Sequence, residues 1–469
     1  MRLGVIALGA SFALGCARPT APAAEDPPAC DYAIAPPAAG SWILDVQASL
    51  ARAPATLLVA PEASDAVREV TIADGDHWRA LARTADGWLA PECRTRCAVR
   101  YRVDLDALAA SCQRMDCARR VGDAVFGPAS TWMLRPEPLG DPFVRVHVAG
   151  GDPARFVTGL RRDPSGSYVL RGHELGEASY TAFGSFRRER VEVPGATLDV
   201  ALLGPPLRMG DAAAIGWIRD GASCEARLFG RFPADTTIFV VPVPGADEVV
   251  FGRVLSLAGA SVALLFGADT PAASEHDDWV VVHEMFHLGT PSFVGEGHWL
   301  EEGLATYYEP ILRERAGWTT EADLWKHFVK EMPRGLRKQG EPASLEDRDD
   351  IDSTYWGGAL FALLADVGIR RATGGARSLD DAVRAALQRE GDATHVARVA
   401  DFLRLGDQVT GTRVLEDADV HYAVGGEAID LDGLWRSLGV QVDPSGAVSL
   451  RDDAPLYSLR EAIASGSVH

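Results

Sequence analysis

The chain has 469 residues, of which 47% are hydrophobic and 24% charged, and its formal net charge is -20 at pH 7. It is long enough for two or three domains with ordinary hydrophobic cores. The strong acidity argues against nucleic acid or an anionic membrane surface as a binding partner and favours solubility.

The amino terminus has the pattern of a targeting segment. A short basic start, Met1-Arg2, precedes an apolar run over residues 3–14 that is too short to span a bilayer permanently. The following Leu14-Gly15-Cys16 resembles a bacterial lipoprotein cleavage site, with Cys16 as the lipid-carrying residue. We therefore expect residues 1–16 to be a lipoprotein-type signal peptide and the protein to be exported and anchored in the bacterial cell envelope. An ordinary signal peptide, giving a periplasmic or secreted soluble protein, is the alternative.

The rest of the chain predicts an α+β multidomain protein. Residues 17–40 are rich in Pro and Ala and indicate a flexible tether. Residues 41–205 contain short alternating runs between Gly, Pro and Asp, which predict an antiparallel β-sandwich. In residues 206–372 we expect a catalytic domain with strands at 237–243 and 261–266. Residues 373–469 are expected to form a C-terminal helical region.

Cysteine usage agrees with export. Apart from Cys16, an even number of cysteines remains, and we expect disulfides between them rather than a zinc knot. Six cysteines allow many pairings; our prediction is two bridges within residues 93–117 and one between the outer two. The disulfide candidates are Cys30, Cys93, Cys97, Cys112, Cys117 and Cys224.

The segment His283-Glu284-Met285-Phe286-His287 predicts a metal site on a buried helix. Residues at i and i+4 share one face of a helix, so His283 and His287 can hold the same ion. Glu284 points away from that line and suits a general base acting on a water that the ion activates. Two imidazoles on an otherwise apolar helix are costly without partners, and a metal supplies one. Chance occurrence of this short pattern is the alternative.

A catalytic zinc needs a third protein ligand, and Glu302 is our prediction for it. It opens a second helix expected over residues 300–315. Glu301 points about 100° away and is expected to be a solvated first-turn carboxylate. Glu309 lies two turns later on the face of Glu302, where it could hydrogen-bond a zinc-bound imidazole. His298, in the preceding loop, is a rival third ligand.

Three further helices are expected after the second zinc helix, over residues 353–371, 378–389 and 397–405. Ser378 with Asp381 three residues later resembles a capping box at the start of the middle one. Tyr355 opens the first, and on spacing alone a tyrosine there is more often a packing residue than a catalyst.

The order of these motifs resembles the gluzincin metallopeptidases of the aminopeptidase N-like superfamily, and most closely the glycyl aminopeptidase branch. The residues that carry the resemblance are His-Glu-x-x-His at 283–287, Trp299-Leu300-Glu301-Glu302-Gly303-Leu304-Ala305 and Tyr355-Trp356-Gly357-Gly358-Ala359. The resemblance implies a thermolysin-like catalytic domain, Glu302 as a zinc ligand, Glu309 in support of the site, and Tyr355 as the donor to the oxyanion.

The chain also departs from that pattern. The gap between His287 and Glu302 is shorter than in aminopeptidase N, and Gly357 replaces a lysine of the tyrosine motif. There is no Gly-x-Met-Glu-Asn segment to hold a substrate amino terminus. The best positional match, residues 257–263, has no carboxylate to bind a substrate ammonium group. Cleavage of internal peptide bonds is therefore an alternative to aminopeptidase activity. We also expect no peptide-binding domain of the kind that members of the glycyl branch often append, because too few residues follow the predicted helices.

The expected function is a zinc-dependent metallopeptidase, an enzyme that binds one Zn²⁺ per chain and hydrolyses a peptide or protein substrate. Aminopeptidase activity is one form of it. The alternative is a catalytically weak or inactive envelope lipoprotein that serves as a binding or structural module. A third alternative is hydrolysis of a non-peptide amide or ester. Membrane attachment depends on a lipid at Cys16, and the sequence leaves the oligomeric state open.

Overall fold

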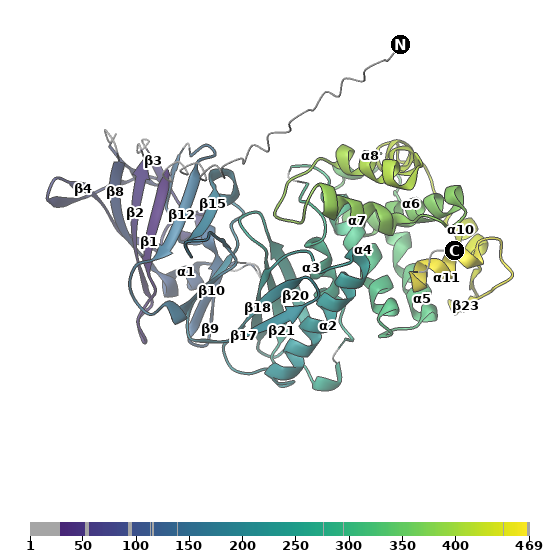
Figure 1. The fold of residues 1–469 in the computed structure, drawn as a ribbon, viewed down its shortest axis with the longest axis horizontal. Helices are drawn as coiled ribbons and strands as arrows, with labels where there is room; N and C mark the ends of the chain where they lie inside the picture. Colours follow the sequence, from purple (N-terminus) through teal and green to yellow (C-terminus); the bar gives the residue numbers. More distant parts are fainter. Residues whose placement is uncertain are drawn as a thin grey trace, which may run out of the picture.

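The computed structural model describes residues 29–51, 56–91, 96–112, 114, 117–137, 139–274, 276–293, 295–443 and 445–466. Cys16 and Cys93 lie outside these residues, so the lipidation site stays a prediction. None of the helices in the described ranges has both the length and the apolar character to cross a bilayer. Three parts follow one another along the long axis of the molecule: a β-rich domain, a smaller mixed sheet, and a helical region (Figure 1).

The amino-terminal domain is built on an eight-stranded sheet, and the predicted sheet-rich region is confirmed. Alternating buried and partly buried side chains, as in Cys30–Ala35, give the strand one face for the domain core. The pair β1–β12 is parallel, whereas its neighbours pair antiparallel. In sheet order the strands are β14 (Arg161–Arg162), β15 (Tyr168–Arg171), β12 (Phe143–Val148), β1 (Cys30–Ala35), β2 (Ile43–Ala51), β8 (Arg96–Asp104), β4 (Val67–Asp74) and β5 (His77–Ala80).

Two four-stranded sheets complete this domain. One has the order β13 (Phe156–Thr158), β16 (Tyr180–Gly184), β10 (Ala124–Pro128), β9 (Arg119–Val121). The other has the order β11 (Arg135–Glu137), β3 (Thr56–Leu58), β7 (Trp88–Leu89), β6 (Ala82–Arg83), and the helix α1 (Leu105–Ser111) follows β8.

Two predicted boundaries were wrong. The tether expected over residues 17–40 ends earlier, because Cys30–Ala35 is an interior strand of the large sheet. The sandwich expected over residues 41–205 also ends earlier. Its last two strands, β17 (Phe186–Val193) and β18 (Ala196–Leu203), belong to the next sheet, where β18 pairs in parallel with β19 (Thr236–Val243).

The second part is a five-stranded sheet with the order β17-β18-β19-β21-β20. Its outer strand β20 (Val249–Leu255) runs antiparallel to β21 (Ser261–Gly267). The helices α2 (Asp211–Phe229) and α3 (Val280–His287) pack on the sheet through a shared apolar core. The expected strands at 237–243 and 261–266 are thus present, and β20 is the free edge nearest α3.

The helices that follow α3 share one hydrophobic core, and side chains of α2 and α3 also contribute to it. The capping box of Ser378 and Asp381 is confirmed. The helices are α4 (His298–Arg315), α5 (Glu321–Glu331), the π-helix η8 (Asp352–Gly357), α6 (Gly358–Thr373), α7 (Leu379–Arg389), α8 (Val399–Thr410), α9 (Val414–Ala418), α10 (Leu431–Leu438) and α11 (Tyr457–Ser465), with a small hairpin of β22 (Val440–Val442) and β23 (Val448–Leu450).

The turn between β20 and β21 is fastened to the amino-terminal domain. Arg161 donates from its side chain to the carbonyl of Leu257 (2.6 Å) and from its backbone to that of Ala258 (2.9 Å). The same guanidinium is held by both oxygens of the buried Glu174 carboxylate. Ser179 donates to the carbonyl of Gly259 (2.6 Å). The first domain therefore fixes one end of the edge strand.

The cysteine predictions are partly corrected. Cys112 and Cys117 form a disulfide, and Cys97 is also disulfide-bonded. Cys30 and Cys224 are free thiols, and the bridge predicted between them was wrong. The reason is their location: each lies in a different hydrophobic core, and burial raises the pKa of both thiols to about 12.

Candidate metal centre

The helix α3 carries both predicted histidines, and glycines on the neighbouring elements let these elements pack closely against it. A Cβ on Gly221 of α2 would lie 3.0 Å from Cγ1 of Val281, tighter than most such contacts, so glycine favours the close packing of α2 on α3. On the other side, a Cβ on Gly252 of β20 would lie 2.3 Å from Cγ of Glu284. His283 and Glu284 are buried in the resulting position.

Glu302 completes the cluster from α4. Its Oε2 lies 3.1 Å from Nε2 of His283 and 3.6 Å from Nε2 of His287. Among the described residues these three side chains are the group of ligand atoms close enough to hold one ion, all within 4.8 Å of one another. Zinc at ordinary bond lengths separates tetrahedral ligand atoms by about 3.3 Å. The donor set and the spacing therefore fit Zn²⁺, with an open fourth position.

The protonation of these groups follows from burial and from the Glu302 charge. Burial opposes a charge on His287, but the Glu302 carboxylate outweighs it and raises the pKa of His287 to about 9. Burial lowers the pKa of His283. Burial also opposes the charge on Glu302, yet the two imidazoles hold its pKa well below the usual range. Burial raises the pKa of Glu284 to about 7, which suits a general base.

The other acidic and imidazole candidates have different partners. Glu301 is partly buried rather than fully solvated: its carboxylate accepts a hydrogen bond from the backbone of Phe293 (2.6 Å), in the loop before α4. His298, the rival ligand, lines the cavity but is not part of the ligand cluster.

Glu309 is not the predicted support for an imidazole. In the described part of the chain it makes no hydrogen bond to either zinc-site histidine and instead accepts from Arg313 at 2.9 Å. Burial raises the pKa of Glu309 to about 7. The i,i+4 spacing on α4 explains the pairing with Arg313.

Tyr355 lies over the cluster, as its predicted role requires. Its ring is parallel to that of His283, with centroids 5.7 Å apart. Burial and the negative charges of Glu302 and Glu284 raise the pKa of Tyr355, so the phenol keeps its proton. The approach depends on glycines, because a Cβ on Gly303 of α4 would lie 2.3 Å from Gly358 of α6. These glycines let the two helices touch and bring Tyr355 to the site.

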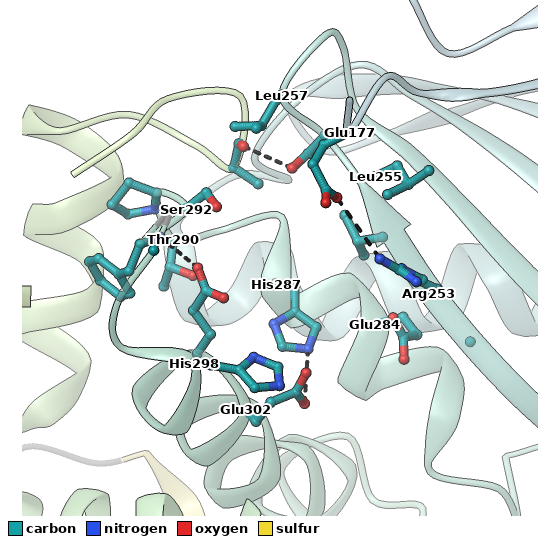
Figure 2. A pocket seen from close by; sticks show the side chains of 18 of the residues that line it. Glu177, Arg253, Leu255, Leu257, Glu284, His287, Thr290, Ser292, His298 and Glu302 are labelled. Atoms are coloured by element: carbon teal, nitrogen blue, oxygen red, sulfur yellow. Dashed lines mark hydrogen bonds and ion pairs between the residues drawn. The ribbon is translucent and has the colours of Figure 1, made fainter. Parts of the chain in front are cut away.

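A cavity of about 750 Å³ opens beside the cluster, and Glu284, His287 and Glu302 line it (Figure 2). Tyr355 is also part of its lining. Its wall includes β20, which has no carboxylate of its own. The positional match expected at residues 257–263 proves to be mostly the turn between β20 and β21. Sequence reasoning missed Glu177 and Arg253, an ion pair at 3.9 Å that lines the same cavity. No sequence pattern near the metal-binding segments could predict this position of Glu177, because the residue belongs to the amino-terminal domain.

Comparison with known proteins gives a structural likeness and no sequence match. No protein-family model matches the chain, and neither does any curated protein sequence. An aminopeptidase N family protein from Idiomarina loihiensis superposes with a TM-score of 0.64 at 15% identity, over 91% of this chain and 82% of that one. An M1 zinc metallopeptidase from Deinococcus radiodurans superposes with a TM-score of 0.49 at 13% identity, over 86% of this chain and 94% of that one.

The likeness to the Idiomarina protein extends over the β-rich domain, the zinc-site sheet and the helices together, since nearly the whole chain is covered. At this identity it speaks for the fold alone. The chain therefore has the fold of an aminopeptidase N family protein.

Proposed function

We propose that this protein is a zinc-dependent metallopeptidase. The observation that carries the proposal is the convergence of His283, His287 and Glu302 on one point, with Glu284 and Tyr355 beside it in the same cavity. Zinc held there would supply a Lewis acid that activates water and polarises the scissile carbonyl. A fold shared with an aminopeptidase N family protein supports a peptide substrate.

The chain's own residues divide the work as follows. His283, His287 and Glu302 would hold the metal. Glu284, with a pKa of about 7, accepts the proton of the attacking water and returns it to the leaving amine. Tyr355 keeps its proton and donates a hydrogen bond to the developing oxyanion.

Aminopeptidase activity is the finer proposal. A free substrate amino terminus needs an anionic contact, and β20 has none. Glu177, which enters the cavity from the amino-terminal domain, supplies a carboxylate there although it is paired with Arg253. Export through the predicted signal and anchoring at Cys16 are part of the same proposal, since an exported peptidase agrees with the disulfide in the first domain.

The test is metal analysis together with peptide cleavage, using Glu284→Gln as the matched variant. We expect about one zinc per chain in both proteins and loss of at least about a hundredfold in hydrolysis in the variant. Peptides offered with free and acetylated amino termini separate aminopeptidase from internal cleavage. A protein that binds no zinc would refute the proposal. A zinc-loaded protein that leaves a broad peptide pool uncut would favour a binding module or a hydrolase of other amides and esters.

A further inference from the structure

A second cavity, of about 640 Å³, adjoins the metal centre on the helical side and meets the first at Tyr355. It reaches His283, whereas the first cavity reaches His287 and Glu302. The acidic cavity along β20 thus ends at the metal, and a different pocket begins there. A peptide that spans the metal has side chains on both sides of the scissile bond, so the second cavity is placed to receive one of them.

The inner wall of the second cavity is aromatic and lies directly against the metal ligand. Trp279 packs edge-to-face on the imidazole of His283, with ring centroids 4.9 Å apart. Tyr355 stacks on the same imidazole from another direction. Both rings line the cavity, so a side chain that enters it would contact aromatic rings that pack directly on His283.

The remaining lining adds apolar surface, and its charges are mostly paired. Glu309 is bonded to Arg313, and Glu331 accepts from Arg334 at 2.8 Å. The pKa of His327 is lowered by burial, so this ring is neutral at pH 7. Asp323 accepts a hydrogen bond from the Thr320 hydroxyl at 2.6 Å, and the charge of Lys326 also acts on it. The apolar members of the lining are Trp279, Pro310, Leu324, Ile351 and Trp356.

Two of these apolar side chains are exposed and lie next to the same cavity. Trp279 is 46% exposed and Ile351 is 71% exposed, and both border this one cavity. Large apolar side chains gathered at a cavity mouth mark a ligand-binding surface rather than a packing defect.

We propose that this second cavity selects a large apolar side chain, aromatic for preference, on the substrate residue that flanks the cleaved bond on that side. This inference rests on the proposed metallopeptidase function and names a specificity site for it. An uncharged benzyl group gains contact with Trp279 and Trp356 and disturbs no ion pair. A carboxylate placed there would be desolvated beside Glu309, and the lining arginines Arg313 and Arg334 are already paired with carboxylates.

The experiment uses two peptide hydroxamates that differ only in a benzyl or a carboxymethyl side chain next to the zinc-binding group. Their binding to the zinc-loaded protein is measured directly, without catalysis. We expect the benzyl compound to bind at least about tenfold more tightly. Ile351→Asp, which places a charge at the mouth far from the ligands, should reduce this ratio several-fold at unchanged zinc content. Trp279→Ala should reduce it too.

The matched control is Val420→Asp, since Val420 is also exposed but borders neither of the two cavities. It should leave the ratio unchanged. Equal binding of the two hydroxamates, or a ratio unaffected by Ile351→Asp, would overturn the specificity site. Cleavage-site mapping on a mixed peptide pool separates the two proposals. Cuts without an apolar preference would leave the peptidase standing and remove this inference. If the peptides stay uncut but the benzyl hydroxamate binds much more tightly, the cavity's apolar preference stands and the peptidase proposal falls.

Discussion

Nε2 of His287 lies 3.6 Å from Oε2 of Glu302, close enough for the carboxylate to set the charge of the imidazole. The carboxylate holds the imidazole in its protonated form, with a pKa of about 9 in the metal-free protein. A metal ligand must be neutral imidazole, so zinc displaces that proton. Without the ion, the positive charge at this site is the proton on His287.

Zinc binding near pH 7 should therefore release about one proton from His287. The apparent affinity should rise about tenfold for each pH unit up to about 9, because the competing proton becomes scarcer. Titration calorimetry in two buffers with different ionisation enthalpies measures the number released. In Glu302→Gln the imidazole loses its ion-pair partner, so binding should be weaker and release fewer protons. Binding with no proton release in the native protein would contradict the assignment.

Tyr355→Phe should keep zinc and fold but lose turnover. The ring still stacks on His283, while the hydroxyl that donates to the oxyanion is gone. Removal of one such donor costs about a hundredfold or more in kcat. The effect should appear in kcat more than in KM. Tyr307→Phe is the matched control, since Tyr307 is buried against Asp366 away from the cavity. A Tyr355→Phe enzyme as fast as the native one would make Tyr355 a packing residue only.

The zinc cluster was predictable because helical geometry alone brings its members together. The i,i+4 spacing of His283 and His287 and the start of α4 at His298 fix three of the groups within a short stretch of chain. The same spacing argument failed for Glu309. Its carboxylate accepts a hydrogen bond from Arg313, one turn later on the same helix, instead of one from a histidine of the cluster.

The domain boundaries and the cavity wall depend on long-range pairing, which local patterns do not report. The strand β18 alternates as a sandwich strand would, but its residues 198–202 pair with β19 in the five-stranded sheet. Cys30 and Cys224 completed an even count, although they belong to separate cores. Glu177 reaches the cavity from the amino-terminal domain, which Arg161 and Ser179 help to join to the β20–β21 turn.

Arg161→Ala should weaken that junction. It would leave the buried Glu174 carboxylate without its partner and free the carbonyl of Leu257, which lines the cavity. We expect a loss of about 2 kcal/mol in the free energy of unfolding, because a buried charge is left unpaired. Denaturant unfolding measures it. Arg190→Ala removes an exposed ion pair with Glu192 and should cost less than about 0.5 kcal/mol. Similar losses in the two variants would show that the junction contributes little.

Glu225 is the last group with a measurable consequence. It lies on α2, fully buried, and neither carboxylate oxygen has a hydrogen-bond partner among the described residues. Burial raises its pKa well above the usual value. The folded state therefore holds a proton that the unfolded chain gives up above about pH 4.3. Stability falls as pH rises through this window, because the folded state binds more protons.

Glu225→Leu should consequently stabilise the metal-free protein by about 1–3 kcal/mol near pH 7, since it removes an unsatisfied buried polar group. The gain should shrink near pH 4, where the carboxyl is protonated in both states. Denaturant unfolding at the two pH values measures this. Glu225→Gln, which keeps the shape and a polar head, should gain less than the leucine variant. A destabilised Glu225→Leu protein at pH 7 would mean that the carboxylate has a partner, and the nearby charge of His287 would be the one to test first.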